Sequence, residues 1–132
     1  MTFVLDTHAW VWWHLRPTAL SRKALGLLSD PGGYDALLWS AISVWEFFKL
    51  FEKGRIGLSC GPEEWVRDAL QMPKLTLAPL TPGIAYRSTT LPPPFHTDPA
   101  DQIIVATARE EKAAVITKDK RIRDYPHVRT YW

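Results

Sequence analysis

The sequence contains a single cysteine, Cys60, among its 132 residues, so no disulfide can form within the chain. It also has no apolar run that approaches the ~20 residues needed for a membrane-spanning helix. The first residues do not combine a basic stretch with a long apolar one, as a secretory signal peptide does. Without an export signal or a disulfide framework, we expect a cytoplasmic protein that does not enter a membrane.

Several widespread catalytic motifs are missing as well. There is no GxGxxG, no Walker A loop, no HExxH and no GxSxG, which are the signatures of dinucleotide-binding proteins, P-loop NTPases, zinc proteases and α/β-hydrolases. The four histidines do not share the short spacings of a zinc site, and for His96 a structural or surface role is favoured. Carboxylates are therefore the main candidates for chemistry.

The net charge is small, because 16 basic residues face 14 acidic ones. From Arg109 onward, seven lysines and arginines outnumber four acids. A mildly basic face in this region would suit a phosphate-bearing partner, and it is equally well explained as solvated surface.

Tryptophan is unusually frequent, with seven residues in the chain. Three of them cluster in Trp10–Trp13, and Trp45 lies among the phenylalanines of the segment Trp45–Phe51. We expect most of these side chains in the core, because aromatic residues bury large areas. The others would form an exposed apolar groove for a partner helix or for a second copy of the chain.

Short apolar runs alternate with amphipathic stretches, which is typical of a parallel α/β sheet. Strands are expected over residues 2–6, 34–39, 75–78, 113–117 and 128–131. Helices are expected over residues 8–15, 18–29, 40–53, 62–71, 82–90, 99–108 and 119–124. We predict one domain over residues 1–132, folded as a three-layer α/β/α sandwich with a mostly parallel central sheet. Right-handed crossovers then bring the loops after the first, second and fourth strands to one edge.

Acidic residues stand just beyond these strands or near the starts of helices. The segment from Phe3 to Thr7 has the pattern of a buried strand that ends in a carboxylate, and ligands bind at the carboxyl ends of parallel strands. The acids expected at this edge are Asp6, Glu46, Asp101 and Asp119, with Asp98 as a neighbour.

Each acid also has a structural explanation. The residues that suit helix N-caps are Asp6, Asp98 and Asp119. Ser43 and Glu46 match a capping box, in which both side chains satisfy the first turn of a helix. Asp101 is less well explained in this way, because it leads directly into a buried run that begins at Ile103.

Four carboxylates at one edge repel one another unless some are protonated or they share a cation. Oxygen ligands without His or Cys partners suit Mg²⁺ or Mn²⁺ better than zinc. A divalent ion that is bound by carboxylates and keeps coordination positions open for water can catalyse phosphodiester hydrolysis. The hydroxyls of Thr7 and Thr117 are expected to orient carboxylates or waters around it.

Four segments carry these residues in a fixed order: Phe3–His8, Ser40–Glu46, His96–Ala108 and Ile116–Asp119. The set resembles the ordered motifs of PIN-domain proteins, and most nearly those of the VapC-type toxins of bacterial toxin–antitoxin pairs. The resemblance spans essentially the whole chain. Any one of the segments is a weak signal, whereas the ordered set is specific.

This resemblance implies an endoribonuclease dependent on Mg²⁺ or Mn²⁺, in which a metal-activated water cleaves structured RNA, often tRNA or ribosomal RNA. It also implies an antitoxin whose peptide covers a groove and blocks the site, and assembly as homodimers or toxin–antitoxin hetero-oligomers. Carried over by position, the catalytic and metal-binding acids are Asp6, Glu46, Asp101 and Asp119. The residues expected to support them are Thr7, Asp98 and Thr117.

One position departs from the pattern. Gln102 stands where relatives often have arginine, which removes a cation near the site, but all four acids are present and an active enzyme is expected. A phosphoacceptor receiver domain is disfavoured because the third expected strand, residues 75–78, carries no acid. A PIN-like domain that binds RNA or protein without cutting stays open, and it would be favoured if the acids did not converge or bound no metal.

Overall fold

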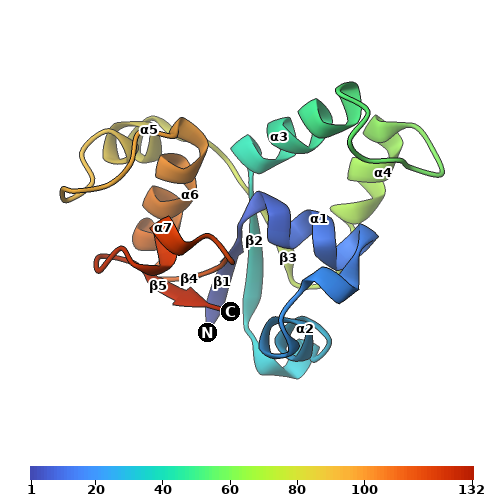
Figure 1. Cartoon of the computed structure of the whole chain (residues 1–132), viewed down its shortest axis with the longest axis horizontal. Coiled ribbons are helices and arrows are strands. Elements are labelled where there is room, and N and C mark those ends of the chain that lie inside the picture. Colours follow the sequence, from blue (N-terminus) through green and yellow to red (C-terminus); the bar gives the residue numbers. More distant parts are fainter.

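A five-stranded sheet, parallel throughout, forms the centre of the molecule in a computed structural model that describes residues 1–132 (Figure 1). The strands are β1 (Thr2–Leu5), β2 (Ala36–Ser40), β3 (Leu75–Ala78), β4 (Ala114–Ile116) and β5 (Arg129–Tyr131). Their order across the sheet is β3-β2-β1-β4-β5.

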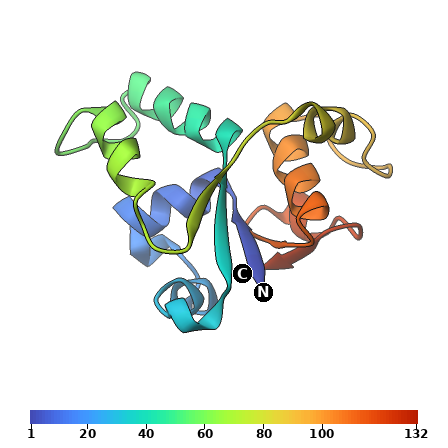
Figure 2. The same cartoon turned by 180° about the vertical axis from the view of Figure 1, so that it is seen from behind.

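Helices cover both faces of this sheet. They are α1 (Thr7–Leu15), α2 (Arg22–Leu28), α3 (Ala41–Glu52), α4 (Pro62–Ala69), α5 (Pro82–Ser88), α6 (Pro99–Glu110) and α7 (Lys120–Arg123). Helices α1, α3 and α4 lie on one side, and α5 and α6 lie on the other (Figures 1 and 2). The predicted three-layer α/β/α architecture is therefore confirmed. None of the helices combines the length and the apolar character needed to cross a bilayer.

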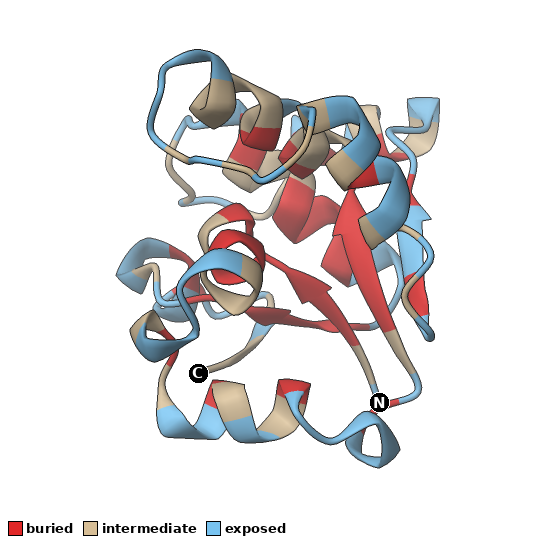
Figure 3. Ribbon diagram, turned by 90° about the vertical axis from the view of Figure 1, so that its right-hand side faces the viewer, coloured by how far each residue is buried: buried red, intermediate tan, exposed pale blue.

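Alternate side chains of the central strands face the two helical layers. In β1, Phe3 and Leu5 join the larger buried cluster beneath α1, whereas Val4 packs in a second cluster with Ile104 of α6. Figure 3 shows the central strands as a continuous buried region between partly exposed helices. Strands buried on both faces explain why these segments are apolar throughout rather than alternating with polar residues.

Tryptophans occupy both predicted environments. Trp10 of α1 stacks on Trp39 of β2, with ring centroids 3.9 Å apart, and both side chains are fully buried. Trp45 of α3, by contrast, is 56% exposed. The expectation that most of these aromatic side chains lie in or against the core, with some left exposed, is confirmed.

The sheet changes its direction of growth at β1, which pairs with β2 on one side and with β4 on the other. In open parallel sheets this arrangement leaves a crevice at the carboxyl ends of the two strands beside the switch point. Asp6 directly follows β1, and Thr117 directly follows β4. The topology alone therefore brings these two side chains together.

One helix begins later than the sequence indicated. Residues Pro17–Ala19 form a short 3₁₀ helix instead of the first turn of a helix over residues 18–29. The backbone is then extended at Leu20, and Ser21 caps α2 by accepting a hydrogen bond from the Ala24 N–H at 3.0 Å. Ser21 is the N-cap because its hydroxyl accepts a hydrogen bond from a first-turn N–H that has no partner within the helix.

Candidate active site

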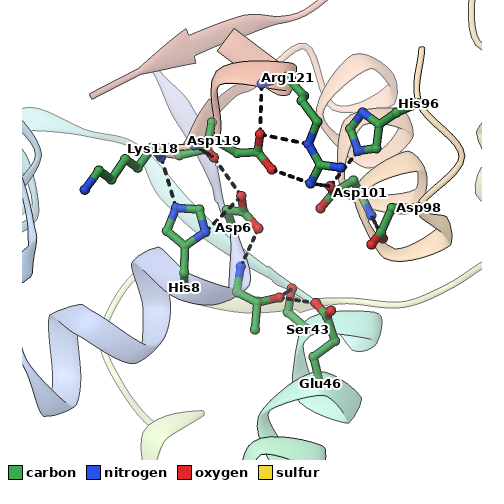
Figure 4. A network of polar contacts seen from close by, with 12 residues as sticks. Asp6, His8, Ser43, Glu46, His96, Asp98, Asp101, Lys118, Asp119 and Arg121 are labelled. Atoms are coloured by element: carbon green, nitrogen blue, oxygen red, sulfur yellow. Dashed lines mark hydrogen bonds and ion pairs between the residues drawn. The ribbon is translucent and has the colours of Figure 1, made fainter.

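Five carboxylates line one cavity at the carboxyl ends of the strands, and its volume is about 610 Å³ (Figure 4). They come from the end of β1, from α3, from the start of α6 and from the turn after β4. These residues are Asp6, Glu46, Asp98, Asp101 and Asp119. The structure thus brings together the four acids predicted as catalytic, together with their predicted neighbour.

Asp6 is buried and tightly held. Its Oδ1 accepts a hydrogen bond from the Thr7 N–H at 2.7 Å, which makes it the N-cap of α1. Its Oδ2 accepts one from the Thr117 hydroxyl at 2.7 Å, and Nδ1 of His8 lies 3.4 Å from the same oxygen. The Lys118 N–H donates to Nε2 of His8, so a neutral His8 carries its proton on Nδ1, facing Asp6.

Thr117 connects two of the acids. While its hydroxyl donates to Asp6, the same oxygen accepts a hydrogen bond from the Asp119 N–H at 3.0 Å. Thr117 is completely buried, so its orientation is set by packing as well as by these bonds. Through these two hydrogen bonds, Thr117 fixes the orientation of the Asp6 carboxylate and the start of the turn that carries Asp119.

Glu46 does not take part in a capping box, and that interpretation was wrong. Helix α3 begins at Ala41, with Ser40 as its N-cap, so Ser43 and Glu46 lie inside the helix. The Glu46 carboxylate instead contacts the Thr7 hydroxyl, which also hydrogen-bonds with the Ser43 hydroxyl at 2.9 Å. Burial raises the pKa of Glu46, and the charges of the neighbouring aspartates raise it further against the opposing hydrogen bond from Thr7.

Asp101 lies in the first turn of α6, where Asp98 is the N-cap and accepts a hydrogen bond from the Asp101 N–H at 3.1 Å. Its Oδ2 lies 2.7 Å from Nε2 of His96. Burial raises the pKa of Asp101 to about 6, and the surrounding carboxylates contribute in the same direction, against the hydrogen bond to His96. A structural role was favoured for His96, yet its ring contacts an acid of the site.

Arg121 supplies a cation that sequence reasoning did not find. Its guanidinium binds both oxygens of Asp119, with Nη2 3.0 Å from Oδ2 and Nε 3.3 Å from Oδ1, and its Nη2 is 3.5 Å from Oδ2 of Asp101. Burial acts to raise the pKa of Asp119, but the hydrogen bonds and charge of Arg121 outweigh it and hold that pKa below its usual range. The side chain of Gln102 faces elsewhere and donates to the carbonyl of His96.

The structural and functional explanations of the acids turn out to be compatible. Asp6, Asp98 and Asp119 are all N-caps, as the structural interpretation required, and all three line the cavity. A capping carboxylate uses one oxygen on backbone N–H groups and leaves the other facing outward. Because the helices start at the carboxyl ends of the strands, those outward oxygens point into one space.

The donor set suits a divalent cation such as Mg²⁺ or Mn²⁺ in chemistry, because carboxylate oxygens are the ligands these ions prefer. As the side chains stand, no three Asp, Glu, His or Cys groups are placed so that they hold a metal ion together. The guanidinium of Arg121 is shared between Asp101 and Asp119. Burial is the main reason why the pKa values of Glu46 and Asp101 are raised, and the charges of the neighbouring aspartates raise both further.

Comparison with known proteins identifies the family of this chain. The PIN domain family model matches residues 3–128. The curated protein Ribonuclease VapC22 of Mycobacterium tuberculosis is 35% identical to this chain over 133 residues, which cover 99% of this chain and 98% of that protein.

Solved structures share the fold. VapBC2 of Rickettsia felis, bound to a DNA fragment from its promoter, matches with a TM-score of 0.72 at 13% identity over the full length of both chains. A toxin–antitoxin complex from Klebsiella pneumoniae matches with a TM-score of 0.65 at 23% identity over 95% of this chain and 93% of that one. The sarcin–ricin loop cleaving toxin VapC20 of M. tuberculosis matches with a TM-score of 0.64 at 15% identity, over 96% and 98%. From the family model and the curated relative, the chain belongs to the PIN-domain family and is similar to its VapC-type members.

Proposed function

We propose that this protein is a Mg²⁺- or Mn²⁺-dependent endoribonuclease that acts as the toxin of a toxin–antitoxin pair and cleaves structured RNA such as tRNA or ribosomal RNA. The observation that carries the proposal is the convergence of Asp6, Glu46, Asp101 and Asp119 on one cavity in a PIN-domain chain. A relative over nearly the whole length is named a ribonuclease, which supports the same reaction class.

The residues have distinct parts in this proposal. The acids that would hold the metal are Asp6, Glu46, Asp101 and Asp119. A bound Mg²⁺ or Mn²⁺ would supply the Lewis acidity that activates a water and neutralises the phosphate. Thr117 and Thr7 keep the carboxylates of Asp6 and Glu46 in place, so little reorganisation is needed when substrate arrives. The side chain of Arg121 is 59% exposed, so a phosphate oxygen can reach its guanidinium, which binds phosphates as it binds carboxylates.

The partners follow from the same proposal. An antitoxin is the expected protein partner, and solved complexes that share this fold include toxin–antitoxin pairs. We place the chain in a homodimer or in a toxin–antitoxin hetero-oligomer, and its activity in the cytoplasm, where the RNA substrates are found.

The test is cleavage of total cellular RNA by antitoxin-free protein in Mg²⁺, in Mn²⁺ and in EDTA. Discrete fragments that require the metal, and that are lost in Asp6→Asn, are expected. Asp124→Asn is the matched control, because Asp124 is an exposed acid that pairs with Lys120 outside the cavity. Loss of cleavage in both variants would point to damage of the fold, and full activity of Asp6→Asn would contradict the site assignment.

The second candidate is a PIN-like domain that binds RNA or protein without cutting it. The ion pairs of Arg121 with Asp101 and Asp119 favour it, because a permanently held guanidinium would keep a metal ion from these oxygens. Folded protein that retains RNA, yet cuts none of it under either metal, would support this candidate and contradict the nuclease.

A further inference from the structure

Basic and aromatic side chains also line the cavity, next to the acids. This basic–aromatic surface consists of Trp45, Lys49, Lys53 and Arg55, which line the same cavity as the carboxylates. It is formed by α3 and by the residues directly after it. Helix α3 therefore carries one of the acids, Glu46, next to a set of side chains of opposite charge.

The spacing of these residues puts them in a row. Trp45, Lys49 and Lys53 are four positions apart, which places them on one face of the helix. The row extends over about 12 Å, given eight residues at a rise of 1.5 Å each. A row of this length can contact more than one phosphate of an unpaired strand.

Trp45 is placed for contact with a ligand rather than with the core. Its side chain is 56% exposed, although Trp10 and Trp39 of the same protein are completely buried. The ammonium of Lys49 lies 5.7 Å from the centroid of its ring. A large aromatic face beside a cation provides what an unpaired nucleotide needs, namely a platform for its base and a partner for its phosphate.

A similar pair borders the acids on another side. Trp12 lines the cavity, and the ammonium of Lys118 lies 5.7 Å from the centroid of its ring. Lys118 directly precedes Asp119, and its backbone N–H holds His8 beside Asp6. Aromatic and basic side chains thus occur together at two places next to the same carboxylates.

We propose that the basic–aromatic surface binds an unpaired stretch of the RNA, with one base stacked on Trp45 and phosphates on Lys49, Lys53 and Arg55. This inference rests on the proposed function and deepens it by naming the form of the substrate. A phosphate held at the acids belongs to a chain that continues in both directions, and this surface offers the neighbouring phosphates cations within the same cavity. Stacking on an aromatic side chain requires a base that is free of a duplex, so the cut lies in a loop, bulge or single strand.

The test measures, by fluorescence anisotropy in EDTA, the affinity of the protein for a short labelled oligouridine and for an RNA duplex of the same length. Trp45→Ala is expected to weaken binding of the single strand by about 5- to 100-fold and to leave binding of the duplex unchanged, since base stacking contributes on this scale. Trp45→Phe should retain most of the affinity. Tyr86→Ala is the control, because Tyr86 is 69% exposed on α5 and does not line the cavity.

The phosphate contacts have their own readout, the salt dependence of binding. Replacing both Lys49 and Lys53 by alanine should lower the slope of log affinity against log salt by about 1.4, at about 0.7 for each contact with a single strand. Arg67→Ala removes an exposed cation on α4 outside the cavity and should leave this slope unchanged.

Three outcomes separate this inference from the proposed function. If the wild type cleaves RNA but Trp45→Ala and the lysine variant bind oligouridine as tightly as the wild type does, the inference is overturned. The surface would then be a contact site for a protein partner. Equal weakening of single-strand and duplex binding by Trp45→Ala would also overturn it. Absence of cleavage by the wild type, with metal present, would overturn the proposed function instead.

Discussion

Replacing Asp101 by asparagine should stabilise the metal-free protein near neutral pH, although it removes one of the acids of the site. The Asp101 side chain is only 13% exposed, and burial raises its pKa to about 6 from an ordinary value of 3.8. The folded state therefore holds a proton more tightly than the unfolded state does. Stability is then lost as the pH rises from about 4 through about 6, and the full cost is present above that range.

The size of the effect follows from the shift. About two pKa units at 1.36 kcal/mol each give an upper limit of about 3 kcal/mol at pH 7.5. The variant also loses the partly exposed ion pair with Arg121, which offsets up to about 1 kcal/mol. We expect a net gain of about 1–2 kcal/mol, or a rise of roughly 0.5–1 M in the urea midpoint.

The measurement is urea unfolding in EDTA at about pH 7.5 and about pH 4.5, with tryptophan fluorescence as the signal. The quantity compared is the difference between variant and wild type, because other groups titrate in both proteins and cancel. Asp124→Asn is the control, since Asp124 is an exposed acid outside the cavity and its charge is not among those that raise the pKa of Asp101. Equal midpoints of wild type and Asp101→Asn at the higher pH would refute the reasoning, and so would a gain of the same size at both pH values.

Three other perturbations test different parts of the structure. Thr117→Val should lower the rate of RNA cleavage about 10- to 100-fold, because it removes a hydroxyl that orients the Asp6 carboxylate. Thr117→Ser keeps this hydroxyl and should cleave at a rate near that of the wild type. Thr107→Val, at a buried threonine of α6 outside the site, should also leave the rate unchanged. Arg121→Gln should tighten Mn²⁺ binding about two- to fivefold in calorimetry by freeing Asp101 and Asp119, and Arg123→Gln should not. Burial lowers the pKa of His14 to about 4, so as the pH falls from about 6.5 toward 4 the wild type should lose up to about 3 kcal/mol relative to His14→Phe, measured by urea unfolding of both proteins.

Much of the fold and the position of the acids could be predicted because both depend on local sequence. Strands buried on both faces are apolar throughout, so β1, β2 and β4 stand out, and the residues that follow them reach the same edge in any parallel sheet. The prediction that Asp6 and Asp119 lie at the same edge of the sheet therefore required no knowledge of side-chain packing. Thr7 and Thr117 were found for the same reason, since they immediately adjoin these strand ends.

The contacts that sequence reasoning missed depend on tertiary geometry. Arg121 is one of several basic residues in its region, and only the course of α7 directs its side chain, rather than that of Arg123, to Asp101. His96 precedes α6 in an irregular segment whose path no periodicity describes. The capping-box pattern at Ser43 and Glu46 failed because Ser40, three residues earlier, already capped the helix.

The central position of β1 has a consequence for when the site comes into existence during synthesis. The hydrogen bond from Thr117 to Asp6 joins residues 111 positions apart, and β4, which carries Thr117 to that place, pairs directly with β1. A nascent chain folds from its N-terminal end as it emerges, but until β4 is available the far side of β1 has no neighbour and Asp6 has no hydroxyl partner. An unfinished chain therefore cannot assemble the carboxylate cluster, and the site takes shape only after β4 has been synthesised.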